Sequence, residues 1–225
     1  MKLSFVDVRY KAPIDLPKEF LDQLPKKVTF FLNIQFHHQY ERLKKQLEAA
    51  GKEVITVRPK HAWHDGQILG CSVEDWSGKG QEAFVYVGDG LFHPKALLFK
   101  NDLKVFIYDP KTEKSKILTK DDIAQIERSR KAALSAFYAS QHVGLIVTTK
   151  YGQSRLKQAQ QLREKYPDKT FYVLLADVID FPKLEDFPFI QVYVNTACPR
   201  IMDDNEKVPR PMLNIEDLPE AKIVW

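Results

Sequence analysis

Cysteine is scarce in this sequence, because Cys71 and Cys198 are the only two among 225 residues. Two cysteines are too few for a disulfide framework, and a reducing compartment keeps them as thiols. No apolar run approaches the ~20 residues that a membrane-spanning helix needs. The residues after Met1 do not follow the pattern of a signal peptide. The composition therefore predicts a cytoplasmic protein with no membrane association.

A large excess of either charge is also absent. The 34 Lys and Arg residues against 30 Asp and Glu residues give a formal net charge of +4. This excess is too small to favour direct nucleic-acid binding, although it permits docking on an acidic partner. The basic residues are scattered, as at Lys44-Lys45, and such runs are ordinarily solvated faces. The 44% of apolar residues suffice for the core of one large domain or two small ones.

Strand and helix patterns alternate along the chain. The β-rich segment Lys27–Gln35 is followed by helical spacing over Gln39–Ala50, and Gly51 ends that helix. Glu53–Val57 has the composition of the next strand, so a right-handed βαβ unit is expected. Further strands are predicted at 83–87, 105–108, 143–148, 171–175 and 190–194, and further helices from Pro94, over Thr119–Ser140 and over Ser154–Lys165.

This order predicts an α/β fold class with two similar small parallel-sheet domains, each built of three layers. The long helix over Thr119–Ser140 joins them, and Thr119 with Asp122 has the spacing of a capping box. We expect the first domain, with an N-terminal strand segment, at 1–130 and the second at 131–225. The proline-rich tail Pro209–Pro219 is expected to lie along the surface without regular structure.

Polar residues follow the carboxyl ends of the predicted strands, where open parallel sheets bind their ligands. Such positions gather helix N-termini and short polar loops. The candidates are Gln35, His37 and His38 after the first core strand, Gly88-Asp89-Gly90 and His93 after another, Thr149, Gly152, Gln153 and Arg155 after a third, and Asp177 and Cys198 after the last two.

Each candidate also has a purely structural explanation. His37 and His38 suit capping or surface positions, and the Gly88–Gly90 loop suits a turn that needs positive φ. Gly152-Gln153 either binds an anion at a helix N-terminus or only caps the helix. Asp177 suits a cap, and Arg200 suits a surface ion pair.

Each cysteine, taken alone, is most simply a small buried hydrophobic residue. No CxxC spacing indicates zinc, and no histidine pairing indicates a nucleophile. The segment Asn195–Arg200 nevertheless places Cys198 on a strand-end loop beside a cation, which favours the thiolate. The segment Gly66–Cys71 places Cys71 directly after Gly70, where backbone can approach a bulky inorganic group closely.

Four motifs occur in order: Gly66-Gln67-Ile68-Leu69-Gly70-Cys71, Gly88-Asp89-Gly90-Leu91-Phe92-His93-Pro94, Thr149-Lys150-Tyr151-Gly152-Gln153-Ser154-Arg155 and Val194-Asn195-Thr196-Ala197-Cys198-Pro199-Arg200. Over residues 26–205 they closely resemble the archaeal-type first-step diphthamide synthase, the 2-(3-amino-3-carboxypropyl)histidine synthase. Gln35-Phe36-His37-His38 resembles the segment after the first strand of that family's middle domain. The resemblance implies three similar α/β domains, of which this chain resembles the middle and C-terminal ones only.

The resemblance further implies that each domain gives one cysteine to a 4Fe-4S cluster, whose fourth iron site binds S-adenosylmethionine. The radical signature CxxxCxxC is absent, as in the family. A 3-amino-3-carboxypropyl radical then attacks a histidine of translation elongation factor 2. By position, Cys71 and Cys198 match cluster ligands. The positions that would bind the amino-acid end of S-adenosylmethionine are Gly152, Gln153 and Arg155. Further cofactor-binding positions are Gln35, His93 and Asp177. The positions that match catalytic residues are Arg200 and His37.

One departure from the family pattern concerns the first cysteine. Family members begin with a further domain that carries it, whereas Leu3–Tyr10 resembles only the last strand of that domain. The resemblance therefore implies that a separate chain supplies this thiolate and that the protein forms a dimer with itself or that partner. The leading hypothesis is an aminocarboxypropyl transferase subunit of a split diphthamide synthase. Two alternatives stay open: a non-catalytic scaffold of the synthase complex, and a nucleotide-binding α/β protein with structural cysteines.

Overall fold

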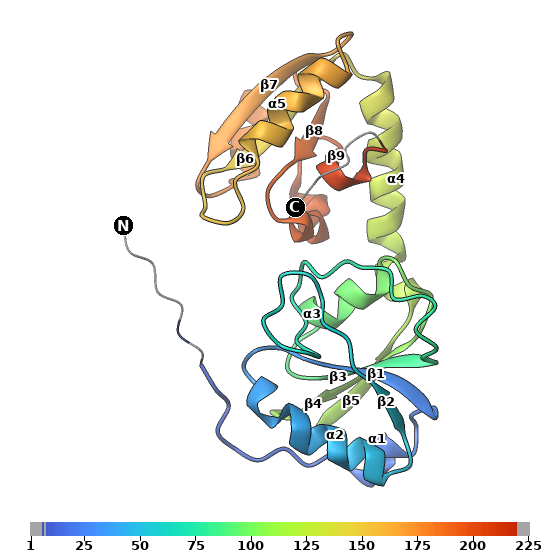
Figure 1. The fold of residues 1–225 in the computed structure, drawn as a ribbon. Helices are drawn as coiled ribbons and strands as arrows, with labels where there is room; N and C mark the ends of the chain where they lie inside the picture. The colour runs from blue at the N-terminus through green and yellow to red at the C-terminus, as the bar shows by residue number, and fades with distance from the viewer. Residues whose placement is uncertain (1–5, 7, 220–225) are drawn as a thin grey trace. The chain divides into compact units, whose positions relative to one another are not determined.

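The computed structural model describes residue 6 and residues 8–219, apart from the side chains of residues 205 and 206. The chain divides into two compact units, Met1–Ile123 and Ala124–Trp225, and each unit contains one β-sheet (Figure 1). Half of the expected strand segment Leu3–Tyr10 lies outside the described residues, and its described residues, 6 and 8–10, belong to no strand. Within the part of the chain that is described, no helix is long and apolar enough to span a membrane.

The first unit is built on a five-stranded sheet with the order β2-β1-β3-β4-β5. All neighbours are parallel except β4 and β5, which form an antiparallel pair. The strands are β1 (Lys27–Leu32), β2 (Glu53–Ile55), β3 (Ala83–Val87), β4 (Val105–Asp109) and β5 (Lys114–Leu118).

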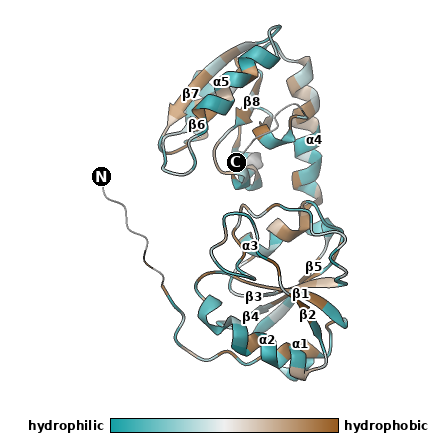
Figure 2. Ribbon diagram, viewed as in Figure 1, coloured by the Kyte–Doolittle hydropathy of each residue, from teal (hydrophilic) through white to brown (hydrophobic). Residues whose placement is uncertain are grey.

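Nearly every residue of β1 and β3 is buried, because both faces of this sheet are covered. Helices α1 (Lys18–Leu21) and α2 (Tyr40–Ala49) pack on one face, and α2 shows mostly hydrophilic residues on its visible side in Figure 2. The other face is covered by the segment around Ile68 and Trp76 and by the 3₁₀ helix η2 (Ala96–Leu98), which continues α3 (Phe92–Lys95). A short 3₁₀ helix η1 (His37–Gln39) precedes α2.

The second unit has a wholly parallel four-stranded sheet with the order β7-β6-β8-β9. Its strands are β6 (His142–Thr148), β7 (Thr170–Ala176), β8 (Val192–Asn195) and β9 (Met212–Asn214). Helices α4 (Ala124–Ala139) and α5 (Leu156–Lys165) cover one face. The 3₁₀ helices η4 (Pro182–Asp186) and η5 (Pro199–Lys207) cover the other, and η6 (Ile215–Asp217) follows β9.

The predicted fold class of two small three-layer parallel-sheet units is confirmed. The expected long helix starts as a 3₁₀ turn, η3 (Lys120–Ile123), before α4. At that start the Thr119 N–H donates to Oδ2 of Asp122 at 2.8 Å, as the capping spacing predicts.

The prediction of an irregular Pro209–Pro219 tail is wrong. This segment supplies strand β9 and helix η6, and Met212, Leu213 and Ile215 are all buried. A three-residue strand close to prolines is too short to show hydrophobic alternation, so no sequence pattern indicated it.

Both units share one strand order, in which the first strand is central, the second lies to one side and the next two lie to the other. The connections from the neighbouring strands β1 and β3 therefore leave in opposite directions, and the same holds for β6 and β8. Ligands of open α/β sheets bind at such switch points, outside the carboxyl ends of the strands. The topology thus selects the loops after β1, β3, β6 and β8 as candidate site segments.

Candidate functional site

The loop that carries Cys71 is attached to the carboxyl end of β1. The Leu32 N–H donates to the Gly66 carbonyl at 2.8 Å, and the Ile68 N–H donates to the Leu32 carbonyl at 2.8 Å. These two bonds extend the sheet by one bridge, between Leu32 and Gln67. The exposed Cys71 follows in a tight turn, in which its carbonyl accepts from the Val73 N–H at 2.7 Å. The sheet therefore holds this thiol at its carboxyl edge.

Two glycines allow close contacts on this loop. Gly66 has φ +69°, and a Cβ atom there would overlap the ring of Tyr40, which is 4% exposed. A Cβ atom at Gly70 would overlap the ring of Phe92 from α3. A larger residue at Gly66 would displace the buried ring of Tyr40, and one at Gly70 would displace the ring of Phe92, which is 48% exposed.

We expect Gly66→Ala to destabilise the protein by about 1–3 kcal/mol more than Gly78→Ala does. Both glycines have a positive φ, +69° and +78°, so both substitutions impose backbone strain. Only Gly66 faces a buried ring, because nothing lies within 4 Å of a Cβ at Gly78. The difference between the urea unfolding midpoints of the two variants measures the cost of the overlap with Tyr40. Equal midpoints would show that this overlap has no effect on stability.

The carboxyl ends of β1 and β3 hold a polar group centred on Asp89. Nδ2 of Asn33 donates to Oδ1 of Asp89 at 3.2 Å, and Nζ of Lys111 lies 2.7 Å from Oδ2. Burial raises the pKa of the Asp89 carboxyl, but the hydrogen bond and charge of Lys111, with Asn33, hold the pKa below its ordinary value. His93 stacks on Tyr86, whose hydroxyl donates to the Asp89 carbonyl at 3.3 Å. Sequence reasoning named the Gly88–Gly90 loop and His93 but missed Asn33 and Lys111.

The predicted histidine segment lies in η1 and the turn before it. Nε2 of His37 lies 2.7 Å from the Asp65 carbonyl, and its ring stacks on those of His64 and Tyr40, with centroids 4.7 Å and 5.4 Å away. His38 is exposed. The Gln35 carbonyl accepts from the Tyr10 N–H at 3.0 Å. The structure thus groups His37 with His64, a partner that the sequence did not indicate.

Protein stability is expected to fall below about pH 6.5 through His37. Burial lowers the pKa of His37 from 6.5, and the charge of His64 lowers it further. The hydrogen bond to the Asp65 carbonyl raises the pKa, but the net shift is downward. The folded state then binds fewer protons than the unfolded state, so this contribution is complete above pH 6.5 and is lost as pH falls through the lowered pKa. Melting temperatures of His37→Phe should depend less on pH between 8 and 5 than those of the wild type. His38→Phe is the control, and equal slopes in all three proteins would contradict the assignment.

In the second unit, Cys198 lies on a loop fixed by two buried asparagines. Nδ2 of Asn195, at the end of β8, donates to the Cys198 carbonyl at 2.9 Å and to Oδ1 of Asn214 at 2.7 Å. Oδ1 of Asn195 accepts from the Ala197 N–H at 3.0 Å. Nδ2 of Asn214 donates to the Pro199 carbonyl at 2.9 Å. The half-buried Cys198 is therefore held at the carboxyl edge of its sheet, as Cys71 is in the other unit.

Arg200 lies in η5, two residues after Cys198 and almost wholly buried. Its Nε donates to Oδ1 and Oδ2 of Asp203 at 3.1 Å and 2.9 Å, and its side chain is 2% exposed. The structure thus places the Arg200 guanidinium, close in sequence to Cys198, in a buried ion pair with Asp203.

The loop after β6 carries the predicted ligand-binding residues of this unit. Gly152 has φ +76°, and Gly152 and Gln153 are exposed. Arg155 occupies the N-cap position of α5, and its side chain forms an ion pair with Glu216 of η6. Asp177, exposed at the end of β7, accepts from the Thr149 hydroxyl at 3.4 Å. Glu216 had no sequence signal, because a pair separated by 61 positions shows no local pattern.

The two cysteines are the candidate cluster ligands of this chain. Among residues 6 and 8–219, no group of three or more His, Cys, Asp or Glu side chains is placed to hold a metal ion. Each unit has one cysteine on a hydrogen-bonded loop, and thiolates are the ligands that iron-sulfur clusters take. The residues present fit two of the thiolate ligands of such a cluster.

Comparisons with known proteins agree with these features. The chain is 32% identical over 204 residues to the 2-(3-amino-3-carboxypropyl)histidine synthase of Pyrococcus horikoshii, covering 88% of this chain and 58% of that protein. It is 30% identical over 216 residues to human 2-(3-amino-3-carboxypropyl)histidine synthase subunit 1, covering 93% and 48%. The crystal structure of Dph2 from Pyrococcus horikoshii with a 4Fe-4S cluster superposes with a TM-score of 0.71 and 27% identity, covering 88% and 57%.

The chain thus spans about half the length of the curated relatives it matches. Residues 1–223 also match a protein family described as "Putative diphthamide synthesis protein". A family match over nearly the whole chain, with 32% identity to a curated member and a TM-score of 0.71 to a solved structure, establishes the relationship. The chain belongs to the diphthamide synthesis protein family.

Proposed function

We propose that this chain is a subunit of a 2-(3-amino-3-carboxypropyl)histidine synthase that acts in the cytoplasm. The enzyme transfers the 3-amino-3-carboxypropyl group of S-adenosylmethionine to a histidine of translation elongation factor 2. One observation carries the proposal: each unit holds its cysteine on a hydrogen-bonded loop at the carboxyl edge of a parallel sheet, in a family with a solved member that contains a 4Fe-4S cluster.

In this proposal Cys71 and Cys198 give two thiolates to one 4Fe-4S cluster. A third thiolate comes from outside these 225 residues, because the sequence has two cysteines. We assign it to a separate chain with an α/β domain, since a second copy would bring only the same two loops. When bound and reduced, the cluster supplies the electron that breaks the bond between the sulfur and the γ-carbon of S-adenosylmethionine, which releases the 3-amino-3-carboxypropyl radical.

Residues of this chain hold and orient the reactants. Arg155 and the Gly152-Gln153 turn bind the amino-acid end of S-adenosylmethionine, with Glu216 orienting the guanidinium. Arg200 fixes the loop behind Cys198 through Asp203.

Four further side chains complete the proposed cavity wall. Gln35, His93 and Asp177 follow strands β1, β3 and β7 and contribute polar groups there. The lowered pKa of His37 keeps its ring neutral near pH 7. When the radical has added to the target histidine, that ring must lose one electron and one proton. The oxidised cluster would take back the electron, and a neutral His37 ring can accept the proton.

Label transfer tests the proposal. The chain is produced with a candidate partner domain that carries one cysteine, and the pair is reconstituted anaerobically with iron and sulfide. S-adenosylmethionine labelled in the aminocarboxypropyl group is then added with elongation factor 2. We expect label in elongation factor 2 only when both chains are present. A cluster-loaded pair that transfers no label would refute the proposed activity.

A scaffold subunit is the second candidate, favoured by the incomplete donor set of the described residues. Such a subunit would keep the fold and support a catalytic homologue without binding the cluster. The cysteine substitutions described in the Discussion separate the two functions.

A further inference from the structure

Phe92 is a large apolar side chain that the first unit leaves partly at its surface, near the Cys71 turn. It begins α3, shortly after the carboxyl end of β3, and it is 48% exposed. The segment that follows is anchored, because Pro94 and all three residues of η2 are buried. The backbone of Phe92 is therefore fixed, while about half of its side chain faces solvent.

The ring of Phe92 packs against Gly70, the residue before Cys71. A Cβ atom at Gly70 would overlap Cε1 of this ring, so the contact needs a residue without a side chain. Gly70 has no positive φ, in contrast to Gly66, and its backbone conformation alone does not call for glycine. The contact with Phe92 therefore accounts for the glycine at this position.

The turn that carries Cys71 is also fixed in the protein. The Ser72 N–H donates to the Leu69 carbonyl at 2.9 Å, and the Leu69 N–H donates to Oγ of Ser72 at 3.1 Å. Ser72 is 3% exposed, whereas Cys71 is exposed. The turn thus holds the thiol at the surface, one residue away from the contact with the ring.

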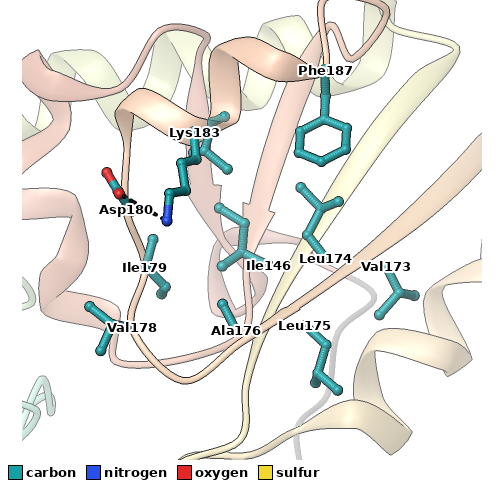
Figure 3. A pocket seen from close by; sticks show the side chains of 11 residues that line it. Ile146, Val173, Leu174, Leu175, Ala176, Val178, Ile179, Asp180, Lys183 and Phe187 are labelled. Carbon is teal, nitrogen blue, oxygen red and sulfur yellow. Dashed lines mark ion pairs between the residues drawn. The ribbon is translucent and has the colours of Figure 1, made fainter.

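An apolar cavity lies in another part of the chain. It has a volume of about 280 Å³ and is bounded by β7, by the turn after it and by η4 (Figure 3). Neither cysteine is among the described residues that line it. Water is therefore excluded from a group on Cys71 only by side chains around that thiol, and Phe92 is placed to do this.

We propose that the exposed part of the Phe92 ring covers the iron-sulfur cluster on its Cys71 side and excludes water from it. This inference rests on the cluster of the proposed function and adds a residue that sets its reduction potential. A cluster gains negative charge on reduction, and water stabilises that charge better than a phenyl ring does. An apolar neighbour therefore lowers the reduction potential. A low potential favours electron transfer to the sulfonium of S-adenosylmethionine.

Potentiometric titration of the reconstituted complex, followed by paramagnetic resonance, tests the proposal. Phe92→Ala should make the potential less negative, by at least about a threefold change in the redox equilibrium, or about 28 mV for one electron. Phe92→Leu keeps apolar bulk and should stay closer to the wild type. The control is Tyr138→Ala on α4, because Tyr138 is also 48% exposed, and it should leave the potential unchanged. A wild-type potential in Phe92→Ala would overturn the proposal.

Gly70→Ala tests the contact itself. The added methyl group should push the ring aside, so the potential should shift in the same direction as in Phe92→Ala. In the double variant the ring is already absent, and Gly70→Ala should add no further shift. Two additive shifts would show that Gly70 and Phe92 act independently, and they would overturn the proposal.

The lifetime of the cluster in air separates this inference from the proposed function. Visible absorbance should be lost at least about threefold faster in the Phe92→Ala complex than in the wild type, because solvent and oxygen reach the cluster more easily. Equal lifetimes in the two complexes would overturn the shielding and leave the proposed function standing. A wild-type complex that takes up no iron or sulfide would refute the proposed function and this inference with it.

Discussion

Replacing Cys71 or Cys198 with alanine should reduce aminocarboxypropyl transfer by the assembled complex to background, a loss of more than about 100-fold. Losing a group that merely supports a metal ligand already costs ~10–100-fold, and these substitutions would remove the proposed ligands themselves. The measurement is label transfer from S-adenosylmethionine to elongation factor 2 under anaerobic conditions. Each variant is compared with the wild-type chain in the presence of the same partner.

The fold of both variants should survive, because Cys71 is exposed and Cys198 is half-buried on a loop that backbone and asparagine hydrogen bonds hold. Gln160→Ala, at an exposed position of α5, serves as the control and should keep full activity. A complex that retains wild-type transfer with both cysteines replaced would establish the scaffold function instead. The comparison therefore decides between the two proposed functions in one experiment.

Asn195→Ala should cost at least about 3 kcal/mol in the free energy of unfolding. The side chain is 1% exposed, and its removal leaves the Cys198 carbonyl, Oδ1 of Asn214 and the Ala197 N–H without their bonds. A buried polar group left unpaired costs about 1–3 kcal/mol. Urea unfolding of the second unit's sheet, followed by circular dichroism, measures the effect.

Asn195→Asp distinguishes packing from hydrogen bonding at the same position. Aspartate has the same shape and still accepts from Ala197, but it cannot donate to Asn214 or to the Cys198 carbonyl. It should therefore be almost as destabilising as alanine. Gln160→Ala should change stability by less than about 0.5 kcal/mol. A cost for Asn195→Ala as small as that of this control would show that the asparagine network does not hold the Cys198 loop.

The sequence predicted the elements that bury continuous apolar runs. β1, β3 and β6 are covered on both faces, so most of their residues are apolar, and short turns mark their ends. Helices α2 and α5 were predicted because their buried residues recur at helical spacing.

Other elements depend on distant contacts. β5 is a lysine-bearing edge strand that only its antiparallel pairing with β4 defines. β9 forms because Met212 and Leu213 complete the sheet beside β8. Neither has a local pattern that separates it from a loop.

The candidate site also has a part that the sequence could predict and a part that it could not. The glycine-rich loops and both cysteines follow strands that the sequence indicated, so their positions could be inferred. The partners that hold them could not: Asn33 meets Asp89 across 56 positions, and Glu216 meets Arg155 across 61. Such pairs arise from the sheet order, which brings separate strand ends to one edge.

The most direct test of the account is the iron and sulfide content of the assembled complex after anaerobic reconstitution. We predict about four irons and four sulfides per copy of this chain, with a paramagnetic resonance signal on reduction, and loss of the cluster when Cys71 and Cys198 are both replaced by alanine. A complete cluster in the doubly substituted complex would contradict the claim that these two cysteines are its ligands.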